Sequence, residues 1–312
     1  MSIIAFILIV VSAVLHASWN LMAKKSTMTV PFYAVICTTS ALLWLHVQFW
    51  TPIPVPDLPG PFWMYLAGSI ASDVTYCFGL LLVYRTMEMS TVYPVMRSLP
   101  LLMTALLTAL LGWGAPLTPV ALAGMGVVFC GCMIMPLKKF SEFSLRNYLN
   151  WNFLFTMLVA LGTTGYTIFD SQSQGVIRAA FPDISKPVVS LTYYSIRGLV
   201  LSSTLWLVIL FRSADRAAVA EFWKNRNLTP VFAGLAASLC YVLVLIAMNY
   251  VTNVSFVQAF RQIGLVLGMA GAFIFLKEKC TLTKIVGIIL ILPDLPSQFS
   301  NNRLQNKKNA LH

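Results

Sequence analysis

Long apolar runs alternate with short polar connections along almost the whole 312-residue chain. A membrane-spanning helix needs about 20 consecutive apolar residues, and ten runs approach that length. They cover residues 3–22, 30–50, 61–84, 91–113, 118–137, 151–170, 187–211, 228–250, 254–276 and 281–295. The pattern predicts an all-α membrane protein with about 10 transmembrane helices.

The polar connections divide the chain further. Four prolines crowd residues 52–59 and predict a turn there, because proline cannot continue a helix. The polar stretch 138–150 lies at the middle of the chain and marks a boundary between two halves. A charged connection, 212–227, has room for a short surface helix.

One pattern occurs in both halves. Residues 93–113 read YPVMRSLPLLMTALLTALLGW, and residues 257–277 read VQAFRQIGLVLGMAGAFIFLK. Aligning them places Arg97 on Arg261, and in each copy a helix breaker follows the arginine three residues later. The first helices of the halves match more weakly, with Trp19 on Tyr166.

Two tandem halves with an odd number of spans must enter the membrane from opposite sides. The sequence therefore predicts a 5+5 inverted repeat, the arrangement that permits alternating access around a central site. The predicted boundaries are 1–140 for the first five-helix repeat, 141–150 for a polar linker, 151–298 for the second five-helix repeat and 299–312 for a polar C-terminal tail.

These features resemble the EamA branch of the drug/metabolite transporter superfamily. The resemblance rests on the 5+5 duplication, on small and aromatic residues in the first helix of each half, and on R-x-x-P/G at Arg97 and Arg261. The turns at 112–118 and 276–283 are similar to the family's G-E-x-L-T turn, although only the second keeps its acid, Glu278. The resemblance covers nearly the whole chain and implies fold and transport, with no particular substrate.

Composition agrees with a membrane protein: 58% of residues are hydrophobic, 10% are charged, and the mean hydropathy is +0.80. The net charge of +11 does not indicate a nucleic-acid partner, because the basic residues lie mainly in the connections. Thirteen lysines and arginines fall in connections after odd-numbered helices and five in the others and the tails. This count places both termini outside, whereas the resemblance implies cytoplasmic termini, so the orientation stays open.

Ionisable residues inside a bilayer are costly and indicate function. Arg97 and Arg261 are candidates to bind a carboxylate or phosphate group; the alternative is snorkelling to the headgroups. Gln258 and Gln262 flank Arg261 and make lipid contact there improbable. Arg197, behind Tyr193 and Tyr194, either lines a cavity or pairs with Asp73 or Asp170 to lock helices together.

Asp73 shares a helix face with Tyr76. It is expected to take the ammonium of a zwitterion, to carry a coupling proton, or to pair with an arginine. Asp170 is expected to be an interfacial carboxylate at the end of its helix.

His16, Trp19, Asn20 and Lys24 recur on one face of the first helix. A polar and aromatic stripe on a spanning helix indicates a water-filled cavity, and Tyr166 at the matching position of the second half supports it. The alternative is helix contact, with Trp19 and Lys24 at the membrane interface. Tyr93, one turn before Arg97, and Tyr241 are further candidates for the cavity.

Three intramembrane arginines against two acids leave a positive interior, which favours an acid or zwitterion, such as an amino acid, an organic acid or a phosphonate-like compound. The sequence thus predicts a secondary transporter in the bacterial cytoplasmic (inner) membrane, with the lipid bilayer and a small-molecule substrate as partners. The alternatives are an efflux pump for amphipathic compounds and an integral membrane lipid enzyme. The six cysteines show no metal-binding spacing and the three histidines supply no catalytic arrangement, so we expect no metal and no cofactor, and the enzyme is the least favoured alternative. No nucleotide-binding loop appears, which argues against direct ATP drive.

Overall fold

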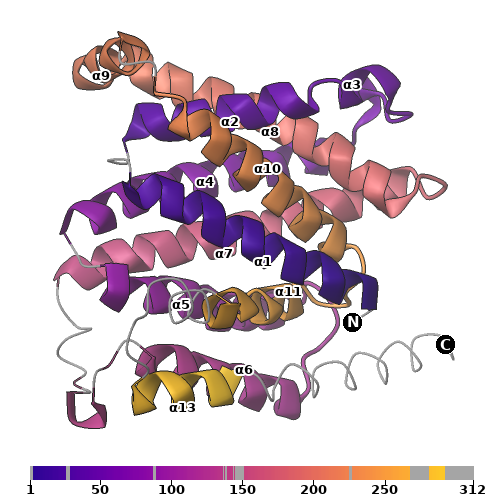
Figure 1. The fold of residues 1–312 in the computed structure, drawn as a ribbon. Coiled ribbons are helices and arrows are strands. Elements are labelled where there is room, and N and C mark those ends of the chain that lie inside the picture. The colour runs from indigo at the N-terminus through magenta and orange to yellow at the C-terminus, as the bar shows by residue number, and fades with distance from the viewer. Residues whose placement is uncertain are drawn as a thin grey trace, which may run out of the picture.

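The computed structural model describes residues 3–25, 29–86, 89–135, 137, 139–142, 144, 151–224, 227–267 and 281–291. Helices are the regular elements throughout this part of the chain, which holds no strand (Figure 1). They are α1 (Ile3–Lys25), α2 (Val30–Trp44), α3 (Val47–Trp50), α4 (Gly60–Thr86), α5 (Met89–Leu111), α6 (Pro119–Ile134), α7 (Trp151–Ala180), α8 (Lys186–Leu210), α9 (Ser213–Lys224), α10 (Thr229–Met248), α11 (Ser255–Phe260) and α13 (Leu282–Ile291), with 3-10 turns at Val55–Asp57 and Phe140–Glu142.

Five segments are long and apolar enough to cross a membrane: Val30–Trp50, Gly60–Val83, Phe153–Ala180, Lys186–Leu210 and Thr229–Met248. Shorter apolar helices accompany them at Ile3–Trp19, Val95–Leu111, Pro119–Ile134 and Leu282–Ile291. Large apolar side chains such as Ile7, Leu110 and Leu207 are exposed, whereas Asp170 and Gln174 are fully buried. Apolar residues outside and polar residues inside are the distribution of an all-α, multi-pass membrane protein.

Local sequence signals set several helix starts. The Thr118 hydroxyl accepts a hydrogen bond from the Ala121 amide (3.2 Å), and Pro119 occupies the first turn of α6, where its missing N–H costs nothing. Thr29 caps α2 in the same way, through the Phe32 amide (3.2 Å). The proline-rich turn is confirmed, since residues 51–59 hold no element beyond one 3-10 turn. The charged connection after α8 contains α9.

The predicted end of the sixth helix at residue 170 is wrong, because α7 continues to Ala180. The polar residues after Asp170 suggested the end of a membrane helix, but in the structure they have hydrogen-bond partners inside the protein. Gln174 is fully buried, and its carbonyl oxygen accepts hydrogen bonds from Ser190 (2.7 Å) on α8 and Asn249 (2.7 Å) after α10. These partners satisfy the polar groups without water, so the helix extends beneath them.

The helices pack in layers (Figure 1). Helix α4 lies along α7, α1 along α10, and α2 against both α8 and α10. Helix α5 contacts α7, α6 and α11, and α6 pairs with α13 in an outer layer.

Glycines allow the closest helix approach, between α4 and α7. A Cβ atom at Gly162 would lie 2.6 Å from the Tyr76 amide nitrogen and 2.7 Å from the Ser72 carbonyl oxygen. A Cβ at Gly165 would collide with the Ser72 hydroxyl. Because Ser72 and Tyr76 flank Asp73, these two glycines set the depth at which the acid sits.

The sequence has glycines at positions 264, 268 and 271, a spacing that predicts close helix packing, and the structure describes only the first of them. A Cβ atom at Gly264 would lie 3.4 Å from the Cβ of Ala13 in α1. Residues 268 and 271 lie outside the described residues. In α6, Gly131 meets Gly287 of α13, and each would place a Cβ within 3.0 Å of the other's carbonyl oxygen. Gly126 has no neighbour within 4 Å of its Cβ position.

Candidate functional site

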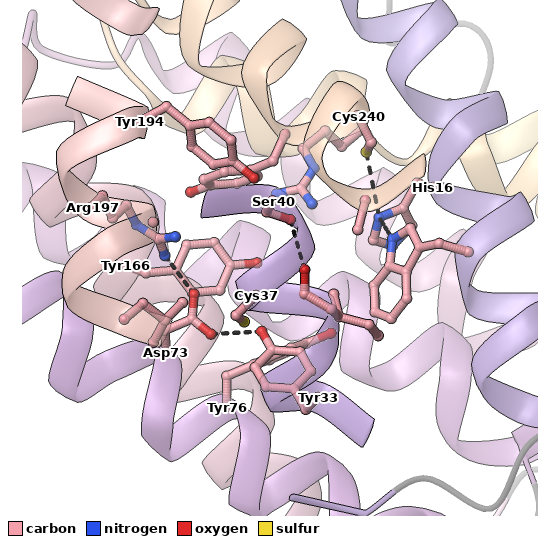
Figure 2. A pocket seen from close by; sticks show the side chains of 17 residues that line it. His16, Tyr33, Cys37, Ser40, Asp73, Tyr76, Tyr166, Tyr194, Arg197 and Cys240 are labelled. Carbon is pink, nitrogen blue, oxygen red and sulfur yellow. Dashed lines mark hydrogen bonds and ion pairs between the residues drawn. The ribbon is translucent and has the colours of Figure 1, made fainter. Parts of the chain in front are cut away.

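A cavity of about 690 Å³, counted with its opening, lies between α1, α2, α4, α7, α8 and α10 (Figure 2). Its wall is largely aromatic, from Trp19, Tyr33, Tyr76, Tyr166, Tyr194 and Tyr241. The ring centroids of Tyr76 and Tyr166 are 5.9 Å apart, and those of Tyr166 and Tyr241 are 5.6 Å apart. Such a wall offers apolar faces together with hydroxyl groups, which suits a small molecule that is partly polar.

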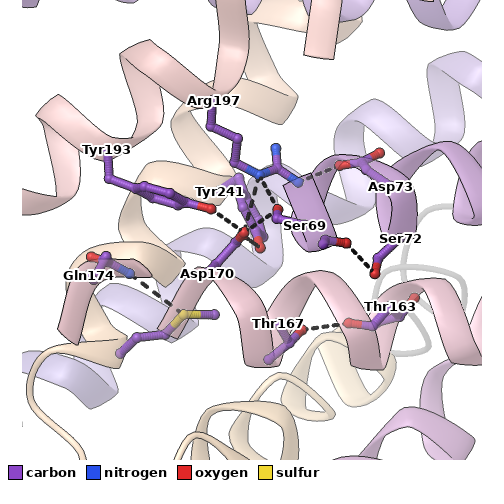
Figure 3. A network of polar contacts seen from close by, with 12 residues as sticks. Ser69, Ser72, Asp73, Thr163, Thr167, Asp170, Gln174, Tyr193, Arg197 and Tyr241 are labelled. Atoms are coloured by element: carbon purple, nitrogen blue, oxygen red, sulfur yellow. Dashed lines mark hydrogen bonds and ion pairs between the residues drawn. The ribbon is translucent and has the colours of Figure 1, made fainter. Parts of the chain in front are cut away.

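Arg197 joins two carboxylates at one side of this cavity (Figure 3). Its Nη2 lies 2.5 Å from Asp73 Oδ2, and its Nε lies 3.3 Å from Asp170 Oδ1. The guanidinium also lies over the rings of Tyr241 (5.2 Å) and Tyr166 (5.9 Å). Both interpretations of Arg197 therefore apply: it lines the cavity and pairs with both acids, linking α8 to α4 and α7.

Asp170 is not an interfacial carboxylate, so that expectation is wrong. It is fully buried within α7 and accepts hydrogen bonds from Tyr193 (2.5 Å), Tyr241 (2.5 Å) and Ser69, besides its ion pair with Arg197. The surrounding donors replace the water that a surface carboxylate would use.

A second cavity, of about 450 Å³, adjoins the first and is bordered by Arg97, Gln258 and Gln262. His16, Tyr76, Tyr166 and Arg261 border both cavities and so form the wall between them. Arg261 is 7% exposed, and the half-buried Arg97 turns inward, with its Nη1 2.7 Å from His16 Nε2. The inward direction argues against snorkelling to the headgroups.

The two arginines of the repeated pattern meet where α5 crosses α11. Arg97 Nη2 donates to the Arg261 carbonyl oxygen (2.6 Å), and Gln262 Nε2 donates to the Arg97 carbonyl oxygen (2.9 Å). Each segment thus binds the other's backbone at the same repeat position. Among the described residues, Arg97 Nε, Arg261 Nη1 and Gln262 Oε1 are buried without a hydrogen-bond partner. Unpaired buried donors are rare, and two guanidinium groups that keep free N–H groups can accept an anion.

The predicted continuous helix 254–276 is interrupted at this crossing. Helix α11 ends at Phe260, residues 261–262 form a turn, and helix resumes at 263–267; residues 268–276 lie outside the described residues. The amides of Gln262 and Gly264 bond three residues back, to Ala259 (3.1 Å) and Arg261 (3.1 Å), instead of four. By contrast, α5 runs through Pro100 without interruption. Broken helices inside a membrane protein occur where they line a cavity.

The described site includes most of the residues predicted from the sequence. His16, Trp19, Asp73, Tyr76, Tyr166, Arg197 and Arg261 border the first cavity, and Arg97, Gln258 and Gln262 border the second. Tyr193 borders neither; it is fully buried behind Asp170. The side chains of Asn20 and Tyr93 lie outside the described residues.

Sequence reasoning missed Tyr33 as a cavity residue, whereas it named Tyr194 beside Arg197 as part of an aromatic cavity wall. The Tyr33 hydroxyl donates to Asp73 (2.7 Å), and Tyr194 borders the cavity from α8. A signal for Tyr194 was present, since it lies three residues before Arg197 on the same helix. Tyr33 has no such neighbour in an otherwise apolar run.

The fold and the site define a helical membrane protein with two adjoining cavities, lined by aromatic, apolar and charged side chains. No family model and no curated protein matches the sequence. The fold is shared with solved structures, of which 28 chains match. One, described as "Crystal structure of protein", is similar with a TM-score of 0.64 at 16% identity, over 96% of this chain and 98% of that chain. At this identity the likeness establishes the fold alone.

Proposed function

We propose that this protein is a secondary active transporter that moves a small polar metabolite with an anionic group by alternating access. The observation that carries the proposal is Arg261, a buried arginine with an unpaired Nη1 that borders both cavities of an apolar helical bundle. Burying a charged side chain inside a membrane is energetically costly, and such residues usually have a function, such as binding a ligand. An amino acid, an organic acid or a phosphonate-like compound would supply the matching anion.

The way in which helices pair supports about ten spans in a 5+5 inverted repeat. In that repeat α1 corresponds to α7 and α4 corresponds to α10. In the structure α1 packs on α10, and α7 packs on α4. The second contact is the equivalent of the first, because each helix is replaced by its counterpart in the other half. Among the other contacts, those of α2 with α8, α5 with α11 and α6 with α13 join each helix to its own counterpart. An approximate two-fold axis would produce this set of contacts, and it favours the EamA-like assignment.

In this mechanism the anion binds at Arg261 and Arg97, while the tyrosines hold the rest of the molecule. One half then rocks against the other, so that the site opens to the opposite side of the membrane. The glycine contacts of α4 with α7 and of α6 with α13 provide smooth surfaces for such a motion. We place the protein in the cytoplasmic membrane of a bacterium, with its orientation to be determined by labelling of its termini.

A thermal-shift screen of purified protein tests the proposal, because a ligand that binds the folded state stabilises it, by about 2.7 kcal/mol at 100 times its Kd. Amino acids, organic acids and phosphonates form the screen. Arg261→Ala should lose the shift given by the best compound. The control is Arg212→Ala, which removes a half-exposed arginine paired with Asp215 on the surface (3.1 Å). Vesicles containing wild-type protein should then accumulate the compound, and equal stabilisation of both variants would refute the assignment.

A second function, efflux of amphipathic compounds, is favoured by the aromatic wall of the first cavity. Such a pump would rely on the rings and little on Arg261. A strain lacking the gene would then become sensitive to amphipathic drugs, and Arg261→Ala would restore resistance as fully as the wild type. Loss of complementation by this variant would instead support the anion transporter.

A further inference from the structure

The two acids that share Arg197 differ in how many hydrogen bonds they accept. Asp170 receives four donors: Ser69, Tyr193, Tyr241 and Arg197 Nε. Three of these donors reach Asp170 Oδ1, and the fourth, Tyr241, reaches Oδ2. Asp170 borders neither cavity and is fully buried. Asp170 is thus held by donors on both carboxylate oxygens and has no contact with cavity water.

Asp73 receives two donors. Tyr33 donates to Oδ1 (2.7 Å) and Arg197 Nη2 donates to Oδ2 (2.5 Å), as Figure 2 shows. About two lone-pair positions remain open. Asp73 is 5% exposed and borders the first cavity, so whatever occupies these positions comes from the cavity side.

The charges around Asp73 are unbalanced. Arg197 is one cation against two carboxylates, which leaves an excess negative charge in a buried cluster. The titratable groups facing Asp73 from the packed helices are Tyr33 and Cys37 (α2), Tyr76 and Cys77 (α4), Tyr166 and Asp170 (α7), Arg197 (α8) and Tyr241 (α10). Arg261 lies against Tyr166, Cys240 and Tyr241 instead. Asp73 borders the first cavity, so a proton can reach this cluster from cavity water.

We propose that Asp73 is the group that binds and releases one proton during the transport cycle, and that Asp170 is the permanent counter-ion of Arg197. The inference rests on the proposed transport function. A proton from cavity water adds to an open position of the Asp73 carboxylate and gives the neutral acid. Arg197 then has Asp170 as its ionised partner, and the cluster becomes neutral. Release returns the same proton to water, with no other bond formed or broken.

Infrared difference spectra between acidic and alkaline pH test this assignment on purified full-length protein in lipid vesicles. The wild type should show the C=O stretching band of a buried protonated carboxyl group, and Asp73→Asn should lose that band. Tyr33→Phe removes the hydrogen bond to Asp73 Oδ1 and should change the pH midpoint of the band. Its matched control, Tyr193→Phe, removes one of four donors to Asp170 and should leave the midpoint in place.

Three results would overturn the proposal. The band could persist in Asp73→Asn; it could move in Tyr193→Phe and not in Tyr33→Phe; or it could be absent at every pH while sodium ions stabilise the wild type and not Asp73→Asn. If Asp73→Asn does not fold, Asp73→Glu keeps a carboxyl group and should change the frequency of the band. No substrate is needed for the spectra, so they can fail while transport is demonstrated, and succeed where no transported compound is found.

Discussion

Replacing Gly162 with alanine should push α4 away from α7. The added Cβ would lie 2.6 Å from the Tyr76 amide nitrogen, 2.7 Å from the Ser72 carbonyl oxygen and 2.7 Å from the Tyr76 Cβ. Two of these are backbone atoms, which cannot turn aside as the tip of a side chain can. Overpacking of this kind typically costs about 1–3 kcal/mol. Alanine also favours the helix over glycine by about 1 kcal/mol, which offsets part of the loss.

The matched control is Gly126→Ala, because no atom lies within 4 Å of the Cβ position at Gly126. Both variants gain the same helix propensity, so their difference isolates the steric term of about 1–3 kcal/mol. Thermal unfolding of both proteins in one detergent, followed by size-exclusion chromatography, measures it. Since Tyr76 and Asp73 move with α4, Gly162→Ala should also weaken stabilisation by the bound compound. Equal midpoints for the two variants would refute the described contact between α4 and α7.

Three further changes give distinct results. Arg197→Leu leaves two buried carboxylates without their cation and should cost at least about 3–5 kcal/mol in thermal unfolding, whereas the surface variant Arg212→Ala should cost under about 1 kcal/mol; similar losses would contradict the buried ion pairs. Thr118→Ala removes the cap of α6 and should lower stability by about 1 kcal/mol, with Thr118→Ser restoring it. Gln262→Leu removes the hydrogen bond to the Arg97 carbonyl and should weaken ligand stabilisation more than it lowers the unfolding midpoint; the reverse ratio would give Gln262 a structural role alone.

Much of the helical organisation follows from the apolar runs alone. Runs such as 187–211 and 228–250 agree closely with α8 and α10. A membrane helix needs only sustained apolarity, and that property is visible without knowledge of its neighbours. The position of His16 and Trp19 at a cavity was also predictable, because polar side chains on a membrane-spanning helix face water or other parts of the protein.

The remaining features depend on partners distant in sequence. The end of α7 was predicted ten residues early, because the local sequence around Gln174 does not reveal that Ser190 and Asn249 are its hydrogen-bond partners. The interruption at residues 261–262 is filled by the guanidinium of Arg97, from the other half of the chain. Tyr33 becomes a cavity residue only because α2 packs beside α4 and brings its hydroxyl to Asp73.

The partition between the two cavities has a consequence for selectivity. Among the described residues, four side chains border both cavities: His16, Tyr76, Tyr166 and Arg261. Side-chain rotamers interconvert far faster than helices move, so the partition can open or narrow while the bundle stays still. In the proposed transporter, these rings and this guanidinium would set the size of substrate that passes between the cavities. Replacing one tyrosine with a shorter residue should widen the passage while the helices keep their positions.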